Sequence, residues 1–303
     1  MPNVEAYNQR LGIALSLVAN SVWGMAAFYW IQTKPASSID VLAHRAVWLV
    51  PVVVLILWGT GRLRSTLPLL KDGKTALTMM LAAFLVAINW GVFLYAVTNG
   101  KATEASLGYF LLPILTVMSG IVVFRERPSF PQKVAIVLGV LAVGVQLVAL
   151  GRLPVIALAV SSSFAVYSVL RKRVSADATQ GLFLESLFLM PIGAIWLVIN
   201  DGAGLGQYGW TTDIFLLCAG AFTALPLVTH VAASRLLPLS TIGLLSYLGP
   251  SLQLIVALTA LGETITPLTL SAFFMVWCGL AFILVDNFRS FQRLRRAGRV
   301  SPP

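Results

Sequence analysis

The sequence predicts an all-α membrane protein: ten transmembrane helices arranged as two inverted five-helix repeats, with both termini cytoplasmic. Of its 303 residues, 58% are hydrophobic and only 11% are charged, whereas about a quarter of the residues of a soluble domain are charged. Apolar runs of about 18 or more residues recur along the chain, and each can cross a hydrocarbon core of ~30 Å as a helix. A motif in the fourth run recurs in the ninth.

Clusters of charged residues, proline and glycine bound the ten predicted helices. The helices cover residues 11–31, 41–59, 75–98, 104–124, 132–150, 153–170, 180–199, 212–234, 240–261 and 268–286. The first run is as long as a spanning helix and contains Asn20, Trp23 and Gly24, so we expect a mature helix rather than a signal peptide. Short connections predict antiparallel neighbours and leave no room for an extramembrane domain.

Lysine and arginine predict the orientation in a bacterial inner membrane. Most of the 21 lie on the side of the N-terminus, including those of a basic tail at residues 289–303. Lys34, Lys101 and Arg152 lie on the other side, and Arg45 lies within a helix. Because cytoplasmic loops carry the excess of positive charge, both termini are expected in the cytoplasm. We expect the tail to lie beside anionic lipid rather than to bind nucleic acid.

The internal repeat relates helices of opposite orientation. Residues Thr103–Pro113 resemble Ser240–Pro250, and a glutamate follows each proline at the same spacing, Glu126 or Glu263. Because five helices is an odd number, the second copy must enter the membrane from the opposite face, which would make Glu126 cytoplasmic and Glu263 external. The predicted repeats are residues 1–151 and 152–288. The alternative is chance similarity between apolar runs.

Several motifs occur in an order that covers nearly the whole chain. They are His44–Trp48, Asn89–Asn99, Glu104–Phe110, Ser163–Tyr167, Arg171–Arg173, Gly181–Ser186 and Ser246–Pro250 ahead of Gly262 and Glu263. In this order they resemble the RarD-type, chloramphenicol-sensitive branch of the drug/metabolite transporter superfamily, whose modules are called EamA-like. The resemblance implies ten helices in two inverted repeats, cytoplasmic termini, and transport, often export, of metabolites or drugs. It does not identify the solute.

Two charged residues lie inside predicted helices, where a charge at the centre costs about 2.5–3.5 kcal/mol on insertion scales. In one interpretation Arg45 binds an anionic group of the solute, and Glu185 binds an ammonium group or carries a coupling proton. In the alternative, each side chain reaches its nearer interface or a neighbouring helix end. Their helices are repeat mates with ends at opposite surfaces, so we do not expect a direct ion pair between them. His44 is a candidate for pH sensing or for a helix contact.

Polar and aromatic side chains at helical spacing form the remaining candidates for solute binding. They are Asn20, Trp23, Trp48, Asn89, Phe93, Ser106, Tyr109, Phe110, Phe164, Tyr167, Phe188, Tyr247 and Gln253. The alternative is ordinary helix packing, in which such groups bond across interfaces for about 0.6 kcal/mol each. Pro113 and Pro250 are predicted hinges or static kinks.

The predicted partners are a small-molecule solute and the lipid bilayer. Small residues Ala135 and Gly139 favour close helix packing, within one bundle or in a homodimer. Cys218 and Cys278 lie in apolar runs, where we expect buried, unpaired thiols and no metal site. No cofactor is expected, and the sequence has no ATP-binding loop of the Gly-x-x-x-x-Gly-Lys-Ser/Thr type. A membrane enzyme acting on a lipid is the alternative function, but no nucleophile elbow or paired-histidine motif occurs.

Overall fold

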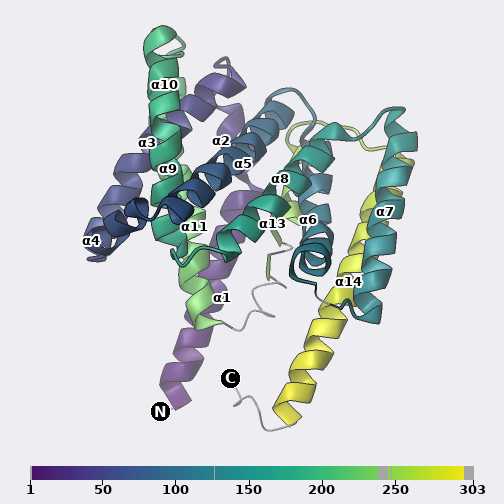
Figure 1. The fold of residues 1–303 in the computed structure, drawn as a ribbon. Coiled ribbons are helices and arrows are strands. Elements are labelled where there is room, and N and C mark those ends of the chain that lie inside the picture. The colour runs from purple at the N-terminus through teal and green to yellow at the C-terminus, as the bar shows by residue number, and fades with distance from the viewer. Residues whose placement is uncertain (1, 126, 238–244, 247, 297–303) are drawn as a thin grey trace.

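The fold is a bundle of helices (Figure 1). The computed structural model describes residues 2–125, 127–237, 245–246 and 248–296, and no β-strand occurs among them. In chain order the helices are α1 (Pro2–Gly24), α2 (Ala26–Ile31), α3 (Ser38–Gly59), α4 (Leu63–Thr66), the 3-10 helix η1 (Leu67–Lys71), α5 (Gly73–Thr98), α6 (Ala102–Phe124), α7 (Phe130–Leu150), α8 (Val155–Lys172), α9 (Ala178–Ile199), α10 (Trp210–Leu217), α11 (Ala219–Leu236), α13 (Leu248–Thr259) and α14 (Pro267–Arg296).

Each predicted run contains a helix, but two runs are interrupted. The run 11–31 is divided at Met25 between α1 and α2. The run 212–234 is divided at Cys218, where α10 and α11 meet at 41°. Both cysteines are free thiols, but neither is buried as expected: Cys218 is exposed at this break, and Cys278 is only partly buried. Such breaks leave backbone groups without helical partners, which spanning segments tolerate where the chain packs against protein or lines a wet space.

The ends of several elements differ from the prediction. The last helix, α14, continues to Arg296 and so includes part of the predicted basic tail. Short helices α4 and η1 lie in the linker between the predicted helices 41–59 and 75–98. The predicted run 240–261 is described as α13 only from Leu248, because residues 238–244 and Tyr247 lie outside the described residues.

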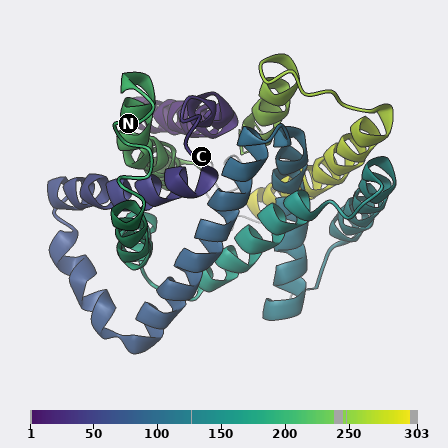
Figure 2. The same cartoon turned by 90° about the horizontal axis from the view of Figure 1, so that it is seen from above.

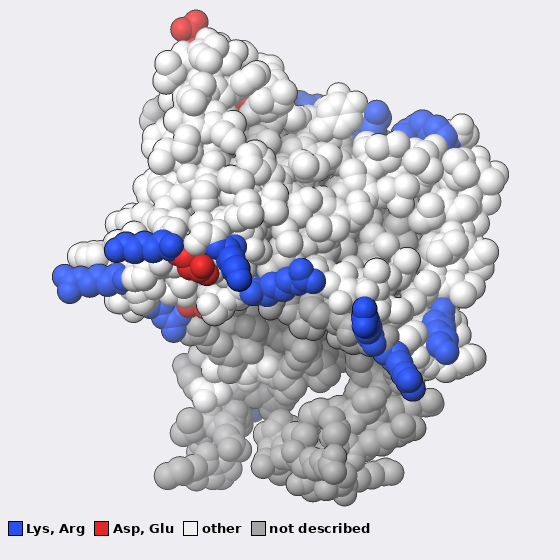
Figure 3. Space-filling view, viewed as in Figure 1, with Lys and Arg blue, Asp and Glu red and all other residues white. Residues whose placement is uncertain are grey.

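The long helices identify a multi-pass membrane protein. Within the described residues, α3, α5, α7 and α9 are each long and apolar enough to cross a membrane, and α10 with α11 adds a fifth span if the bent pair is one segment. Parts of α8, α13 and α14 are apolar but shorter. On the face shown in Figure 3, Lys and Arg gather at a lower and an upper level, with a broad uncharged belt between them. That pattern fits a surface in contact with hydrocarbon.

The long helices pack against one another in specific pairs. Helix α3 packs against α9 and α11, α5 and α6 pack against α8, and α1 packs against α11 and α13. The pair α7 and α14 forms one flank of the bundle, as seen from above (Figure 2). The start of α1 and the end of α14 lie on the same side of the molecule (Figure 1).

Helix α11 approaches α3 at a glycine. A Cβ on Gly220 would overlap the backbone of Trp48 and Leu49. We expect Gly220→Ala to destabilise the protein by about 1–3 kcal/mol, because the α3 and α11 backbones must separate. The control is Gly144→Ala on α7, where an added Cβ meets no atom within 4 Å. Thermal unfolding of the purified protein in detergent should show a lower midpoint for the Gly220 variant alone, and equal midpoints would contradict this account of the contact.

Candidate functional site

Arg45 is buried in an aromatic cage. Its side chain comes from α3, and its guanidinium carbon lies 3.7 Å from the ring centroid of Trp90 on α5 and 5.1 Å from that of Trp30 on α2. The residue is only 8% exposed. Among the described residues no carboxylate forms an ion pair with it, and its buried Nε has no hydrogen-bond acceptor.

The two indole rings compensate only part of the cost of burying this charge. A desolvated cation–π contact contributes about 2 kcal/mol, but it acts on the face of the guanidinium. The five N–H groups point outward in the plane and need acceptors. Burying a charge without a counter-charge costs several kcal/mol of free energy. The indole rings therefore cover the face of Arg45 but leave its Nε–H without an acceptor among the described residues.

Two tyrosines and an asparagine continue this polar region. Tyr109 on α6 donates to Oδ1 of Asn89 over 3.0 Å, and Nδ2 of Asn89 donates to the Val160 carbonyl of α8 over 2.8 Å. Tyr29 donates to the Phe215 carbonyl over 2.6 Å and stacks on Phe222 of α11, with ring centroids 3.9 Å apart. Helices from the second half of the chain thus contact the residues next to the cage.

Phe93 completes the aromatic wall next to this network. Its ring meets that of Tyr109 edge to face, with centroids 5.7 Å apart. Aromatic side chains with one polar tip suit a site that holds an amphipathic ligand. The candidates Asn89 and Phe93 of α5 therefore lie together with the candidate Tyr109 of α6, which is close enough to Arg45 to interact with its charge.

His44, the neighbour of Arg45, is held by the protein itself. Its Nε2 lies 3.0 Å from the Gly202 carbonyl and 3.3 Å from that of Ala203, while Nδ1 accepts from Trp48 Nε1 over 3.2 Å. These partners fit a neutral imidazole with the proton on Nε2. His44 and Trp48 thus tie α3 to the loop that follows α9.

Glu185 lies on α9 and is 1% exposed. Its Oε1 lies 3.4 Å from Nε of Arg171, an ion-pair distance without hydrogen-bond geometry. The Tyr167 hydroxyl lies 3.4 Å from Oε2. Phe164 packs beside Tyr167, with ring centroids 5.1 Å apart. Arg45 and Glu185 have separate neighbours, as expected from their corresponding positions in two helices predicted to run in opposite directions.

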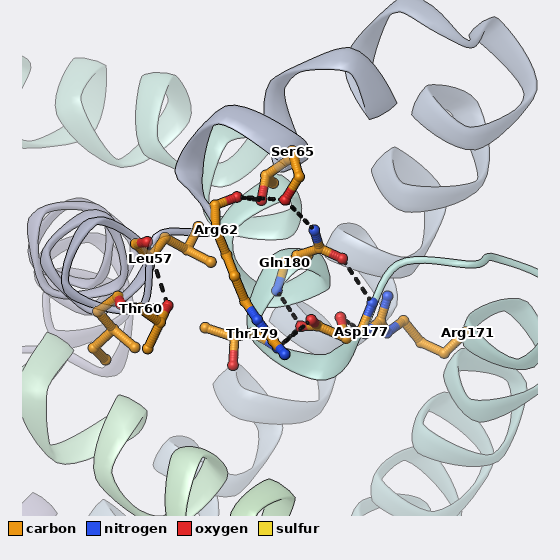
Figure 4. A network of polar contacts seen from close by, with 10 residues as sticks. Leu57, Thr60, Arg62, Ser65, Arg171, Asp177, Thr179 and Gln180 are labelled. Carbon is orange, nitrogen blue, oxygen red and sulfur yellow. Dashed lines mark hydrogen bonds and ion pairs between the residues drawn. The ribbon is translucent and has the colours of Figure 1, made fainter.

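Arg171 connects Glu185 to a network at the N-terminal end of α9. Its Nη2 donates to the Asp177 carbonyl over 3.1 Å, and the Asp177 carboxylate pairs with Arg62 over 2.8 Å. Figure 4 shows Arg62 and Arg171 reaching Asp177 from different elements, with Gln180 against Ser65 beside them. A Cβ on Gly181 would overlap the Arg171 guanidinium, so a glycine there makes room for this side chain. The network joins the linker after α3 to the start of α9.

Trp90 and Phe188 pack between the two charged regions. Both belong to a cluster with the buried Ala46 and Leu189, and Tyr167 packs against the same cluster. Trp90 therefore contacts Arg45 and also packs against the cluster that Tyr167, a neighbour of Glu185, contacts. The two regions are separated by aromatic side chains.

A third polar region surrounds Trp23 of α1. Gln253 of α13 donates through Nε2 to the Trp23 carbonyl over 3.1 Å, and the His230 ring of α11 lies 5.3 Å from the Trp23 ring. Gln253 Oε1 and His230 Nδ1 are buried without partners among the described residues. Asn20 donates to the Ser16 carbonyl over 2.8 Å, within its own helix.

The remaining predicted residues lie elsewhere. Ser106 of α6 donates to the Pro250 carbonyl of α13 over 3.0 Å, which joins two predicted repeat mates. Pro250 lies in the first turn of α13 as described, and Pro113 lies within α6. Phe110 meets Phe273 and Trp277 of α14 edge to face, apart from the charged residues. Tyr247 and Glu126 lie outside the described residues.

Two acidic residues cap helices at the opposite end from the Arg62 network. Both carboxylate oxygens of Glu263 accept from backbone amides at the start of α6, those of Ala102 over 2.6 Å and Thr103 over 2.8 Å. Glu104 accepts from the Ile156 amide of α8 over 3.1 Å and pairs with Arg152 over 2.9 Å. Carboxylates at helix N-termini are stabilised by the free N–H groups and the helix dipole.

A shallow hollow of about 430 Å³ opens at the surface. It is lined by Lys34, Pro35, Ala36, Ser37, Ser38, Ile39, Tyr95, Thr98 and Asn99, and contains neither Arg45 nor Glu185. Its lining is the loop before α3 and the end of α5, so it is no candidate for the site. The described residues contain no group of three His, Cys, Asp or Glu placed to hold a metal ion.

Sequence reasoning did not identify several residues that the structure brings to the site. Trp30, Trp90 and Tyr29 surround Arg45, yet no spacing rule relates residues 29–30 to residue 45. Trp90 directly follows the candidate Asn89 and could have been included on that ground. Arg171 was counted among the basic residues that predict the topology and within the Arg171–Arg173 motif, but it was not a candidate for the site.

The described part of the chain combines several apolar spans with buried charged side chains, a pattern that is typical of multi-pass membrane transporters. The EamA-like transporter family matches residues 10–148. A RarD protein of Salmonella typhi is 35% identical and covers 93% of this chain and 97% of its own length. The chain therefore belongs to the EamA-like transporter family and, within it, to the RarD-type branch.

Two further relatives are similar to this chain in sequence, and one solved structure is similar to it in fold. An uncharacterized transporter of Vibrio cholerae is 34% identical over 97% of this chain and 98% of its own. A protein of Pseudomonas aeruginosa described as chloramphenicol-sensitive protein RarD is 30% identical over 95% and 98%. A crystal structure matches with a TM-score of 0.61 and 16% identity over 89% of this chain and 96% of that one, a likeness in fold alone. These names point to a transporter of small molecules rather than to an enzyme.

Proposed function

We propose that this protein is a secondary transporter that exports small organic metabolites or drugs across the bacterial inner membrane by alternating access. Transport is driven by proton coupling or by exchange. The observation that carries the proposal is the pair of buried charged residues, Arg45 and Glu185, at equivalent places in two helices of opposite direction. Two equivalent halves around a central site provide access to either face in turn.

The beginnings of α3 and α9 support two inverted repeats. Helix α3 starts with a capping box between Ser37 and Asp40, and α9 with one between Asp177 and Gln180. Measured from the two N-caps, Arg45 corresponds to Glu185, Trp48 to Phe188, and Pro51 to Pro191. A shared cap, a shared proline position and a buried charge at one spacing are difficult to attribute to chance similarity of apolar runs.

Helix packing also supports ten spans in two halves, residues 1–151 and 152–288, followed by a basic tail at 289–303. The pairs α3–α9 and α7–α14 each join helices that correspond in the two halves, and the pair α5–α8 has its counterpart in α11–α1. The family match to residues 10–148 is close to the first proposed half. With ten spans both termini lie on one side, which the basic residues assign to the cytoplasm.

Contacts between the halves at opposite ends of the bundle provide two gates. At one end Glu263 of the second half binds the start of α6 in the first. At the other end Arg62 and Ser65 of the first half contact Asp177 and Gln180 of the second. Alternating access requires that each end opens in turn, so these contacts must break and form during a transport cycle.

Flux through proteoliposomes tests the proposal. We expect a panel of amino acids, vitamins, nucleosides, organic acids and chloramphenicol to include at least one solute whose movement depends on the protein. That flux should rise when a pH gradient, or a high concentration of the same solute on the far side, is imposed. Failure of every panel member to move faster than in empty liposomes, with folded protein confirmed by thermal unfolding, would contradict the proposal.

A further inference from the structure

We propose that the solute is an organic monoanion, with one carboxylate-like group on an apolar or aromatic body, and that its anionic group binds the edge of Arg45. That this anion is transported rests on the proposed function. The binding site rests on contacts within the described residues.

Three charged side chains are buried in the described part of the chain: Arg45, Glu104 and Glu185. Glu104 is paired with Arg152 and also accepts from the Ile156 amide. Its charge is therefore balanced within the protein. It lies at the start of α6, where it caps a neighbouring helix.

Glu185 is also balanced by the protein. Arg171 lies at ion-pair distance from one carboxylate oxygen, and the Tyr167 hydroxyl lies near the other. A solute ammonium would have to displace Arg171, which is itself anchored to the Asp177 carbonyl. These contacts disfavour a cation or a zwitterion whose ammonium group needs Glu185.

Arg45 is the buried charge without a counter-charge among the described side chains. Trp90 and Trp30 cover it as ring neighbours, and its Nε lacks an acceptor. A carboxylate accepts two parallel hydrogen bonds from the edge of a guanidinium, a geometry that an ammonium or a neutral amide cannot reproduce. One bound anion would neutralise this part of the bundle.

The surroundings of Arg45 select the rest of the molecule. Tyr29 stacks on Phe222, and Phe93 meets Tyr109, so aromatic rings from both halves border the cage. An apolar or aromatic body would pack against these rings while the carboxylate meets Arg45. A small hydrophilic anion such as phosphate would make no use of this aromatic border.

Binding to the purified full-length protein in detergent tests the inference. Titration calorimetry would compare a series of arylalkanoates, starting from 3-phenylpropionate, with their uncharged amides and with phenylalanine as the zwitterion. In the wild-type protein at least one carboxylate should bind at least about tenfold more tightly than its amide and than the zwitterion, a difference of about 1.4 kcal/mol. Arg45→Gln should remove this preference, and Arg45→Lys should retain part of it.

The matched control is Arg64→Gln, at an exposed arginine of α4, which should bind like the wild type. Thermal unfolding without ligand shows whether each variant folds. If Arg45→Gln does not fold, Arg45→Lys still tests the inference. An amide or amine that binds as tightly as every carboxylate would overturn the inference, as would a series in which no carboxylate binds folded wild-type protein. Anion binding without flux would instead refute transport and leave the anion site standing.

Discussion

Cross-linking either end of the bundle should stop transport completely and reversibly. At one end the pair is Lys101→Cys with Glu263→Cys, since Glu263 binds the amides that follow Lys101. At the other end the pair is Ser65→Cys with Gln180→Cys, whose native side chains lie 3.4 Å apart. A short methanethiosulfonate cross-linker would hold one end shut. If the halves must separate at each end in turn, either cross-link alone arrests the cycle.

The experiment needs a background in which Cys218 and Cys278 are replaced by serine, because Cys218 is exposed. Flux in proteoliposomes should fall to that of empty liposomes after cross-linking and return when a reductant is added. Each single-cysteine variant, treated in the same way, is the control for the chemistry. Full flux with a pair shown by mass spectrometry to be cross-linked would mean that this end does not open, and alternating access through it would be abandoned.

The membrane class and helix positions could be predicted from the sequence because they depend on local composition. An apolar run long enough to span a bilayer becomes a helix whatever its neighbours are, since backbone groups in hydrocarbon must bond internally. The breaks at Met25 and Cys218 were not predicted, because neither position carries a proline or a charged residue. The extension of α14 to Arg296 was missed because hydropathy detects where hydrocarbon ends, not where the helix ends.

The candidate site could be predicted only in part. Arg45 and Glu185 stand out in sequence because intramembrane charge is costly. Their partners do not, because the cage is assembled from α2, α3, α5 and α6 by packing over long sequence separation. The i to i+4 spacing of Asn89 and Phe93 predicted a shared helix face, but neither its contact with Tyr109 nor its orientation toward Arg45. Arg171 looked like a cytoplasmic loop charge until its ion pair with Glu185 was seen.

Glu185→Gln should abolish the response of transport to a pH gradient. Glu185 is buried and lies close to Arg171 and Tyr167, so it can carry a proton across the cycle only by alternating between a paired carboxylate and a neutral acid. Glutamine resembles the neutral form and cannot release a proton. We expect flux driven by a pH gradient to fall by at least about tenfold, while exchange of solute for solute continues.

Arg171 gives this expectation a structural mechanism. It lies within ion-pair distance of Glu185 and donates to the backbone carbonyl of Asp177, whose carboxylate pairs with Arg62 of the other half. Protonation of Glu185 removes the counter-charge of Arg171 and so loosens the end of the bundle that this network holds. In Glu185→Gln that loosening would be permanent, so exchange should be retained while coupling is lost.

The matched control is Glu104→Gln, because Glu104 is also buried and paired with an arginine but lies at the other end of the bundle. It should change stability and leave the response to the pH gradient as in the wild type. Initial rates with and without the gradient, at equal amounts of reconstituted protein, provide the comparison. A Glu185→Gln variant that still accelerates with the gradient as the wild type does would exclude Glu185 as the proton carrier, and exchange would then remain as the drive.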